Sequence, residues 1–140
     1  MKARDLMTSN PECVTADDTL QRAAQIMRDR DVGAVPVVES RDTMRLAGVI
    51  TDRDIAIRHV AEGHRAEDQV RNHMSAGKLR TVGPDASADE VLNAMRDGQV
   101  RRIPVVEGDR LVGIIAQADV ATEGVGDRKV GETVEQISQR

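Results

Sequence analysis

The chain has 140 residues, of which 39% are hydrophobic and 31% charged, and its formal net charge is −4; this length suits one domain, or two small units that share a core. The acidic balance argues against a nucleic-acid-binding protein. No apolar run is long enough to span a membrane. The N-terminus lacks the apolar core of a signal peptide, so we expect a cytoplasmic protein. Because Phe, Tyr and Trp are absent, the core must be aliphatic, and a bound base would lie between aliphatic groups or stack on an arginine.

Cys13 is the single cysteine of the chain. We expect its thiol to be a small buried core group, with a reactive or dimer-linking thiol as the alternative.

The first half of the chain predicts a helix followed by a hairpin and a second helix. Apolar residues over 20–27 recur at the spacing of one helix face. Two β-branched runs, at 34–38 and 46–50, are joined by a polar loop and predict a hairpin. A second helix is expected over 52–62, so the predicted order is strand, helix, strand, strand, helix.

The second half of the chain predicts the same order of elements. Ser87 followed by Glu90 forms a capping-box pattern, which predicts the start of a helix. Strands are expected at 103–106 and 111–115, followed by a helix over about 117–123. A short C-terminal helix is predicted from apolar residues at helical spacing, namely Val130, Val134 and Ile137.

Matching stretches indicate that the two halves are copies of one unit. "VGAVPVV" at 32–38 matches "VRRIPVV" at 100–106, and "LAGVITDRDIA" at 46–56 matches "LVGIIAQADVA" at 111–121. Each copy is small for an independent core, so the copies are expected to pack on each other. The sequence therefore predicts an α+β architecture of two β-α-β-β-α repeats, with their two small sheets packed face to face.

These landmarks resemble a known family. The duplicated unit, the apolar-Pro step before "VV" and the closing Gly-x-x-Thr-x-x-Asp pattern look like a tandem pair of CBS domains, also called a Bateman module. The resemblance covers nearly the whole chain and is closest to small stand-alone CBS proteins. It implies one CBS repeat at 1–69 and a second at 70–140 that ends in the short helix, related by pseudo-twofold symmetry.

The resemblance also implies a function. CBS pairs bind adenosine-containing effectors such as AMP, ADP, ATP, S-adenosylmethionine or NAD in clefts between the repeats, and two modules often form a homodimer. The family is regulatory and has no catalytic chemistry. A chain without an effector domain would signal to a separate protein that the sequence does not identify. No contact with a nucleic acid polymer or a membrane is expected.

The junction "GVITDRDIA" carries the first candidate site. Asp54 matches the Asp of the family pattern, and its carboxylate suits the two hydroxyls of a ribose. Thr51 offers a hydroxyl beside a helix N-terminus, which suits a phosphate. An N-cap made by Thr51 and Asp54 is the structural alternative, and both roles can coexist. In the second copy, Asp119 retains a possible ribose contact, whereas Ala116 has no hydroxyl for a phosphate.

Two arginines favour a single composite ligand site over two equivalent sites, one in each copy. Arg101 and Arg102 precede the second apolar-Pro step, where the family often places basic residues that reach phosphates, and their forked donors match phosphate oxygens. A solvated surface role is the alternative for this pair. The site would then join Thr51 and Asp54 to the two arginines. Walls for the adenine are expected from Val14, Thr15, Val35 and Pro36.

The remaining polar residues predict neither catalysis nor metal binding. No nucleophile is paired with a base, so an enzyme is not expected. The histidines, His59, His64 and His73, lack the tight spacing of metal ligands, and no metal is predicted. The alternative to a ligand sensor is a ligand-free dimeric scaffold that keeps the CBS fold.

Overall fold

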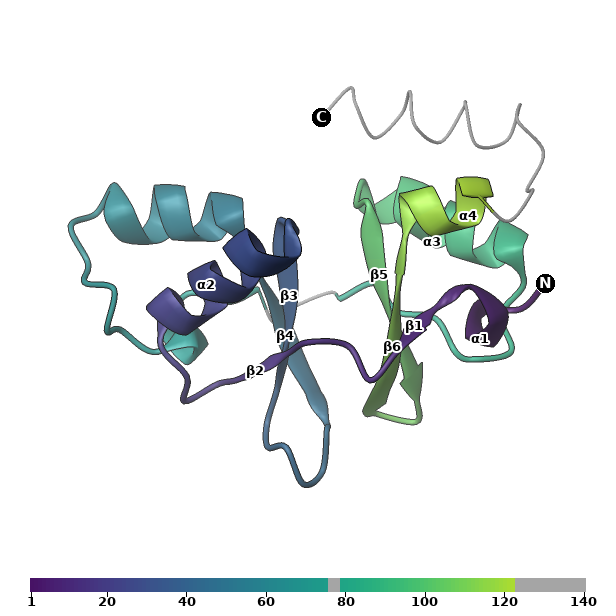
Figure 1. The fold of residues 1–140 in the computed structure, drawn as a ribbon, viewed down its shortest axis with the longest axis horizontal. Coiled ribbons are helices and arrows are strands. Elements are labelled where there is room, and N and C mark those ends of the chain that lie inside the picture. The colour runs from purple at the N-terminus through teal and green to yellow at the C-terminus, as the bar shows by residue number, and fades with distance from the viewer. Residues whose placement is uncertain (76–78, 123–140) are drawn as a thin grey trace. The chain divides into compact units, whose positions relative to one another are not determined.

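The computed structural model describes residues 1–75 and 79–122. The chain forms two compact units, shown in Figure 1. The central unit is Glu12–Leu79, and the terminal unit joins Met1–Pro11 to the chain from Arg80 onward. The helix predicted from Val130 to Ile137 lies outside the described residues. Within the described part, no helix is both long enough and apolar enough to cross a membrane.

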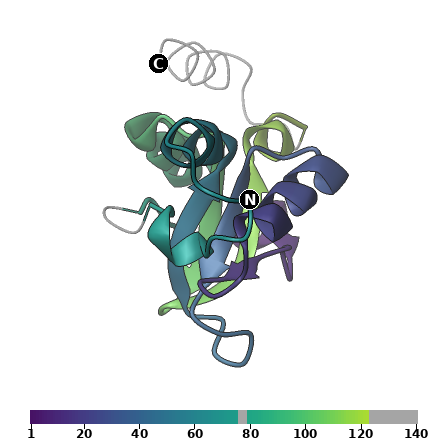
Figure 2. The ribbon, with the colours of Figure 1, turned by 90° about the vertical axis from the view of Figure 1, so that its left-hand side faces the viewer.

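The central unit is a three-stranded sheet covered by helices. Its strands are β2 (Val14–Thr15), β3 (Ala34–Val38) and β4 (Leu46–Thr51), and its helices are α2 (Leu20–Arg30), the π-helix η1 (Asp54–Val60) and the 3₁₀-helix η2 (Val70–Asn72). β3 lies in the middle, parallel to β2 and antiparallel to β4, which confirms the predicted hairpin. Figures 1 and 2 show α2 and η1 on the same face of this sheet. The core between them includes Val14, Leu20, Ala23, Ile26, Val35, Val37, Ile50 and Val70.

The terminal unit repeats this order with the first strand reduced to one bridge. Its strands are β1 (Thr8–Ser9), β5 (Arg102–Glu107) and β6 (Arg110–Ala116), and its helices are α1 (Ala3–Leu6), α3 (Ala88–Gly98) and α4 (Gln117–Thr122). β6 lies between β1 and β5 and is antiparallel to both. A parallel bridge from Val82 to Val105 stands where the central unit has β2. The predicted α+β class and β-α-β-β-α order are confirmed.

Equivalent helices of the two units begin and end alike. Thr19 Oγ1 accepts the N–H of Arg22, and Ser87 Oγ accepts the N–H of Glu90, each at 3.1 Å. These bonds satisfy amide groups that the first helical turn leaves free, and the second confirms the cap predicted at Ser87. Both helices then end at a left-handed residue, with φ of 53° at Asp31 and 52° at Gln99.

The boundaries of the compact units differ from those of the predicted repeats, 1–69 and 70–140. The reason is that each repeat contains a short segment that pairs with the sheet of the other repeat. "RDLMT" at 4–8 lies in the terminal unit, where Thr8 pairs with Ile114 of β6. "RNHMS" at 71–75 lies in the central unit, where Ser75 and Val49 of β4 exchange two backbone bonds of 2.9 and 3.0 Å. Each segment therefore pairs with a strand in the sheet of the other repeat.

Cys13 is a buried core residue. Its side chain is free of any disulfide and the residue is 7% exposed. Burial raises the pKa of the Cys13 thiol, and the nearby Arg41 guanidinium opposes this shift. The preferred expectation of a small buried group is confirmed.

Candidate functional site

The junction between β4 and η1 is held by two reciprocal hydrogen bonds. The N–H of Thr51 donates to Asp54 Oδ2 at 3.1 Å, and the N–H of Asp54 donates to Thr51 Oγ1 at 3.0 Å. Asp54 is only 8% exposed, and its Oδ1 lies 3.8 Å from Arg58 Nη1 one turn along. The structure thus places the two predicted ligand residues together in the reciprocal pattern of a capping box. Their ribose and phosphate roles stay predictions.

The second copy keeps half of this arrangement. The N–H of Ala116 donates to Asp119 Oδ2 at 3.0 Å, as Thr51 does to Asp54. Ala116 has no hydroxyl to accept the reciprocal bond. The Asp119 carboxylate therefore accepts the same backbone bond as that of Asp54. What the second copy lacks is the bond that the backbone N–H of Asp54 donates to the Thr51 hydroxyl.

The residues predicted to surround the adenine lie on two paired strands of the central unit. Val14 and Thr15 form β2, and Val35 and Pro36 belong to the adjacent β3. Val14 and Val35 are fully buried in the core, so their side chains pack inside the unit, and their role beside an adenine stays a prediction. The N–H of Thr15 already donates to Asp18 Oδ2 at 2.8 Å.

The arginine pair belongs to the terminal unit. Arg101 is exposed and comes just before β5, and Arg102 begins that strand and is half-buried. Thr51 and Asp54 belong to the central unit. The composite site that would join these four residues stays a prediction.

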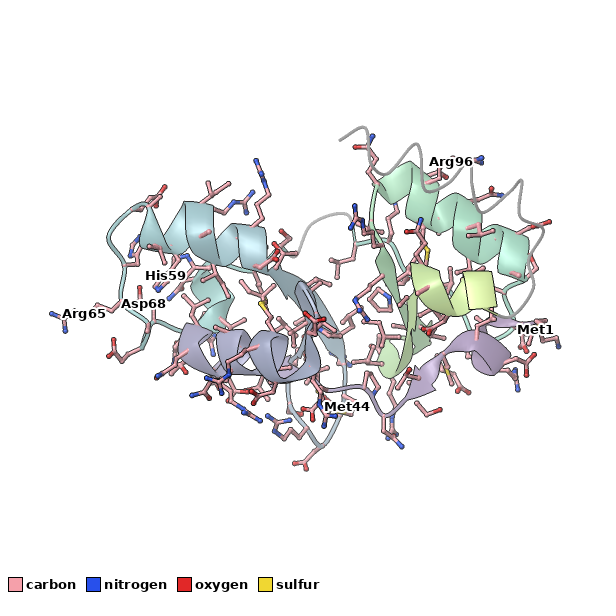
Figure 3. All side chains as sticks on the ribbon, turned by 45° about the horizontal axis from the view of Figure 1, so that its top comes forward. Met1, Met44, His59, Arg65, Asp68 and Arg96 are labelled. Carbon is pink, nitrogen blue, oxygen red and sulfur yellow. The ribbon has the colours of Figure 1, made fainter. Side chains whose placement is uncertain are left out.

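A second group of polar residues converges in the central unit, where the sequence predicted no site. All three histidines of the chain surround one carboxylate oxygen, Asp68 Oδ2. This oxygen lies 3.3 Å from His64 Nδ1, 3.7 Å from His73 Nε2 and 4.0 Å from His59 Nδ1. Figure 3 shows His59 and Asp68 side by side at the outer end of η1. We call His59, His64, Asp68 and His73 the histidine cluster.

Burial distinguishes the histidine cluster from a solvated charge group. His59 is 2% exposed and His73 is 8% exposed, and their rings meet edge to face with centroids 5.0 Å apart. His59 Nδ1 is buried and has no hydrogen-bond partner among the described residues. Leaving such a group unpaired costs about 1–3 kcal/mol. A ligand for this nitrogen would remove that cost.

The donor atoms of this cluster suit a transition metal. His59, Asp68 and His73 each offer one ligand atom, and these atoms all lie within 4.8 Å of one another. Imidazole nitrogen and carboxylate oxygen are ordinary zinc ligands. A pocket of about 520 Å³ opens beside them. Its lining consists of Arg58, Glu62, His64, Asp68, Asn72, His73 and Met74.

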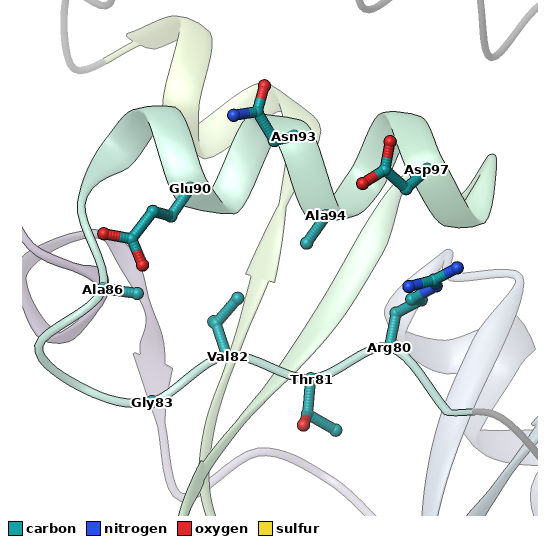
Figure 4. Close-up of a pocket in the computed structure, with 9 residues that line it drawn as sticks. All are labelled: Arg80, Thr81, Val82, Gly83, Ala86, Glu90, Asn93, Ala94 and Asp97. Atoms are coloured by element: carbon teal, nitrogen blue, oxygen red, sulfur yellow. The ribbon is translucent and has the colours of Figure 1, made fainter.

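A further pocket, of about 420 Å³, lies in the terminal unit between α3 and the segment from Arg80 to Gly83 (Figure 4). Glu90 and Asp97 reach it from α3, and Arg80 lies across from Asp97. None of the sequence-predicted site residues lines this pocket, and no nucleophile is paired with a base there.

Comparisons with known proteins agree with the repeated architecture. The family model described as CBS domain matches residues 3–59 and 70–126. Hypoxic response protein 1 of Mycobacterium tuberculosis is 42% identical over 119 residues, which cover 85% of this chain and 82% of the relative. The crystal structure of Hypoxic Response Protein I, with two coordinated zinc ions, has a TM-score of 0.81 and 39% identity, and the match covers 89% of this chain and 100% of that one.

One more structural neighbour carries adenosyl ligands. The CBS domain pair of protein MJ0100, in complex with 5-methylthioadenosine and S-adenosyl-L-methionine, matches with a TM-score of 0.75 and 23% identity over 88% of this chain and 94% of that one. At this identity the likeness shows the fold.

The prediction that the histidines hold no metal is contradicted by two findings. One is the convergence of His59, Asp68 and His73 around shared donor atoms, and the other is the zinc in a relative of 39% identity. Sequence spacing missed the cluster because a loop closes between η1 and η2 and brings distant positions together. The available signal was that all three histidines fall between residues 59 and 73, with Asp68 among them.

Proposed function

Because the chain belongs to the CBS-domain family, we propose that it is a non-enzymatic regulatory module that binds an adenosine-containing ligand and signals to a separate partner. CBS pairs are regulatory or signal-transduction modules. A bound ligand shifts the equilibrium between two conformations of such a module only as far as its affinities for the two conformations differ.

The Thr51–Asp54 junction is the observation that carries this proposal. The bond from the Thr51 N–H to Asp54 Oδ2 orients the Asp54 carboxylate before a ligand arrives, so little side-chain entropy is lost on binding. The carboxylate retains acceptor capacity for ribose hydroxyls. The adenosyl ligands of the MJ0100 pair support this class of ligand. Arg101 and Arg102 would add phosphate contacts, and the main chain of Val14 and Val35 would border the base.

The test is a binding assay on the purified protein. Without Trp or Tyr the chain barely absorbs at 280 nm, so co-purified nucleotide would appear as a clear band near 260 nm. After removal of any such ligand, AMP, ATP, S-adenosylmethionine and NAD are added in turn, and a true ligand raises the melting temperature with its concentration. A melting temperature that none of the four compounds changes would instead favour the ligand-free scaffold. Ala116 also favours the scaffold, because it has no hydroxyl for a phosphate.

The histidine cluster supports a second function, binding of a zinc ion by His59, Asp68 and His73. The observation that carries it is the buried, unpaired His59 Nδ1 beside Asp68 and His73. The zinc in Hypoxic Response Protein I supports the choice of metal. Metal analysis after dialysis against zinc tests it. Stoichiometric zinc is expected in the wild-type chain, and zinc-free protein would reject the site.

An exposed apolar strip on η1 supports a homodimer. Ile57 is 48% exposed and Val60 is 65% exposed, and they lie three positions apart on this helix. A second copy of the module is the proposed partner for this strip. Analytical sedimentation tests this assignment. The double variant Ile57→Ser, Val60→Ser is expected to sediment as a monomer, whereas the wild type is expected to sediment as a dimer.

A further inference from the structure

We propose that His64 is a fourth metal ligand, so that the histidine cluster holds zinc in a closed shell of His59, His64, Asp68 and His73. This inference rests on the zinc site proposed above. It goes beyond that site because it assigns the coordination number, the ligating atom of His64 and the kind of role that the ion has.

The position of the His64 ring carries the first step. Among the three histidines, His64 has the shortest approach to Asp68, with 3.3 Å between its Nδ1 and Asp68 Oδ2. Its ring meets His73 edge to face at a centroid distance of 5.0 Å and stacks on His59 at 5.8 Å. The three rings and the carboxylate therefore enclose one small volume around Asp68 Oδ2.

The second step concerns the orientation of the His64 ring. Its Nδ1 faces Asp68, while its Nε2 lies 3.5 Å from Glu62 Oε2 on the outer side. Histidines that bind metals usually donate the other ring N–H to a carboxylate or carbonyl, which fixes the ring and raises its basicity. Glu62 is placed to accept that N–H. The geometry therefore assigns Nδ1 of His64 as the ligating atom.

The donor atoms that lie within 4.8 Å of one another are those of His59, Asp68 and His73, so the proposed fourth ligand requires the His64 side chain to rotate toward the ion. Neighbouring ligand atoms around a tetrahedral zinc lie about 3.4 Å apart, given Zn–N distances of about 2.0–2.1 Å. The backbone of His64 is already anchored, since its N–H donates to the carbonyl of His59 at 3.0 Å. Its side chain is 44% exposed and can rotate. Gly63, with φ of 78°, makes the turn that aims His64 back at η1.

A closed shell determines what the ion can do. Structural zinc sites have four protein ligands, whereas catalytic sites keep a position for water or substrate. Three neutral imidazoles and one carboxylate fill the tetrahedral positions and leave no such position. The ion would instead tie the end of η1 to the residue after η2 and so hold the loop between them. Because η1 begins at Asp54, the same ion would steady the helix that carries the proposed ligand residue.

The test compares zinc binding by the wild type, His64→Ala and the matched loop control Arg65→Ala. Zinc affinity is measured by chelator competition, and the number of bound imidazoles by X-ray absorption at the zinc edge. We expect three imidazoles in the wild type and in Arg65→Ala. In His64→Ala we expect two imidazoles and an affinity lower by at least about tenfold. Circular dichroism of the metal-free proteins checks that all three fold alike.

The outcomes separate this inference from the zinc site on which it rests. If wild-type protein binds zinc and His64→Ala binds it with the same affinity and the same imidazole number, His64 is not a ligand and only the three-ligand site stands. If the wild type binds no zinc at all, the site itself is rejected, and the fourth ligand with it. If His64→Ala loses affinity while both proteins show two imidazoles, His64 acts from outside the shell and the inference is overturned.

Discussion

Thr51 and Asp54 hold each other through two backbone-to-side-chain hydrogen bonds, of 3.0 and 3.1 Å, at the point where β4 becomes η1. Asp119 in the other copy accepts only the single bond from Ala116, at 3.0 Å. The two carboxylates thus accept the same backbone bond, and the junctions differ by the bond that the backbone N–H of Asp54 donates to Thr51 Oγ1.

Asp54→Ala is expected to lower the free energy of unfolding by about 1 kcal/mol, because the Thr51 N–H loses its side-chain acceptor. Asp54→Asn is expected to retain most of the stability, since its amide oxygen can still accept the Thr51 N–H, but to weaken any adenosyl ligand by removing the charge. Urea denaturation and calorimetry measure the two effects. Asp119→Ala removes the equivalent bond in the other unit and is the comparison for stability. Equal ligand affinity in wild type and Asp54→Asn would remove Asp54 from the ligand site.

Replacement of Arg101 and Arg102 together by alanine is expected to weaken binding of ATP more than binding of adenosine, because the guanidinium groups would contact phosphate oxygens. Arg110→Ala, an exposed change on β6 of the same unit, serves as the control for net charge. Calorimetric titration of both ligands measures the difference. Unchanged ATP affinity in the double variant would assign the pair to the solvated surface.

His73→Ala is expected to abolish the rise in melting temperature that zinc produces in the wild type. A ligand at one hundred times its dissociation constant stabilises the folded state by about 2.7 kcal/mol, so the wild-type shift should be plain and should disappear with EDTA. Arg65→Ala, whose side chain points away from the cluster (Figure 3), should behave as wild type. A full zinc shift in His73→Ala would contradict the proposed site.

Gly48→Ala is expected to destabilise the central unit by roughly 1–3 kcal/mol through overpacking. A Cβ at this position would lie 2.7 Å from the carbonyl oxygen of Ser75, which is backbone and cannot swing aside. Gly83→Ala is the matched control, because its nearest neighbour is the carbonyl oxygen of Val106 at 4.0 Å. Thermal unfolding of both variants measures the difference, and equal losses would argue against the close docking of Ser75 on β4.

Local patterns in the sequence predicted the elements well. The run at 34–38 is β3, the Ser87 cap is present, and the helix expected at 117–123 is α4 over Gln117–Thr122. These features depend on residues close together in the chain. The sequence did not reveal the pairing of β1 with β6, because a two-residue strand has no readable period.

The candidate sites were less predictable for the same physical reason. Thr51 and Asp54 could be found because they lie three positions apart in one local motif. The histidine cluster depends on how the loop between η1 and η2 closes over Asp68. That closure follows from tertiary contacts, such as the bond from the N–H of Val70 to the carbonyl of Asp18 at 2.8 Å. No spacing rule along the chain encodes it.

The most direct test of the proposed regulatory role is calorimetric titration of the ligand-free wild-type chain with AMP, ATP, S-adenosylmethionine and NAD, each with and without zinc. Saturable binding of at least one of these compounds, weakened in Asp54→Asn, is the predicted result. No saturable heat with any of the four, under either condition, would contradict an adenosyl-binding module.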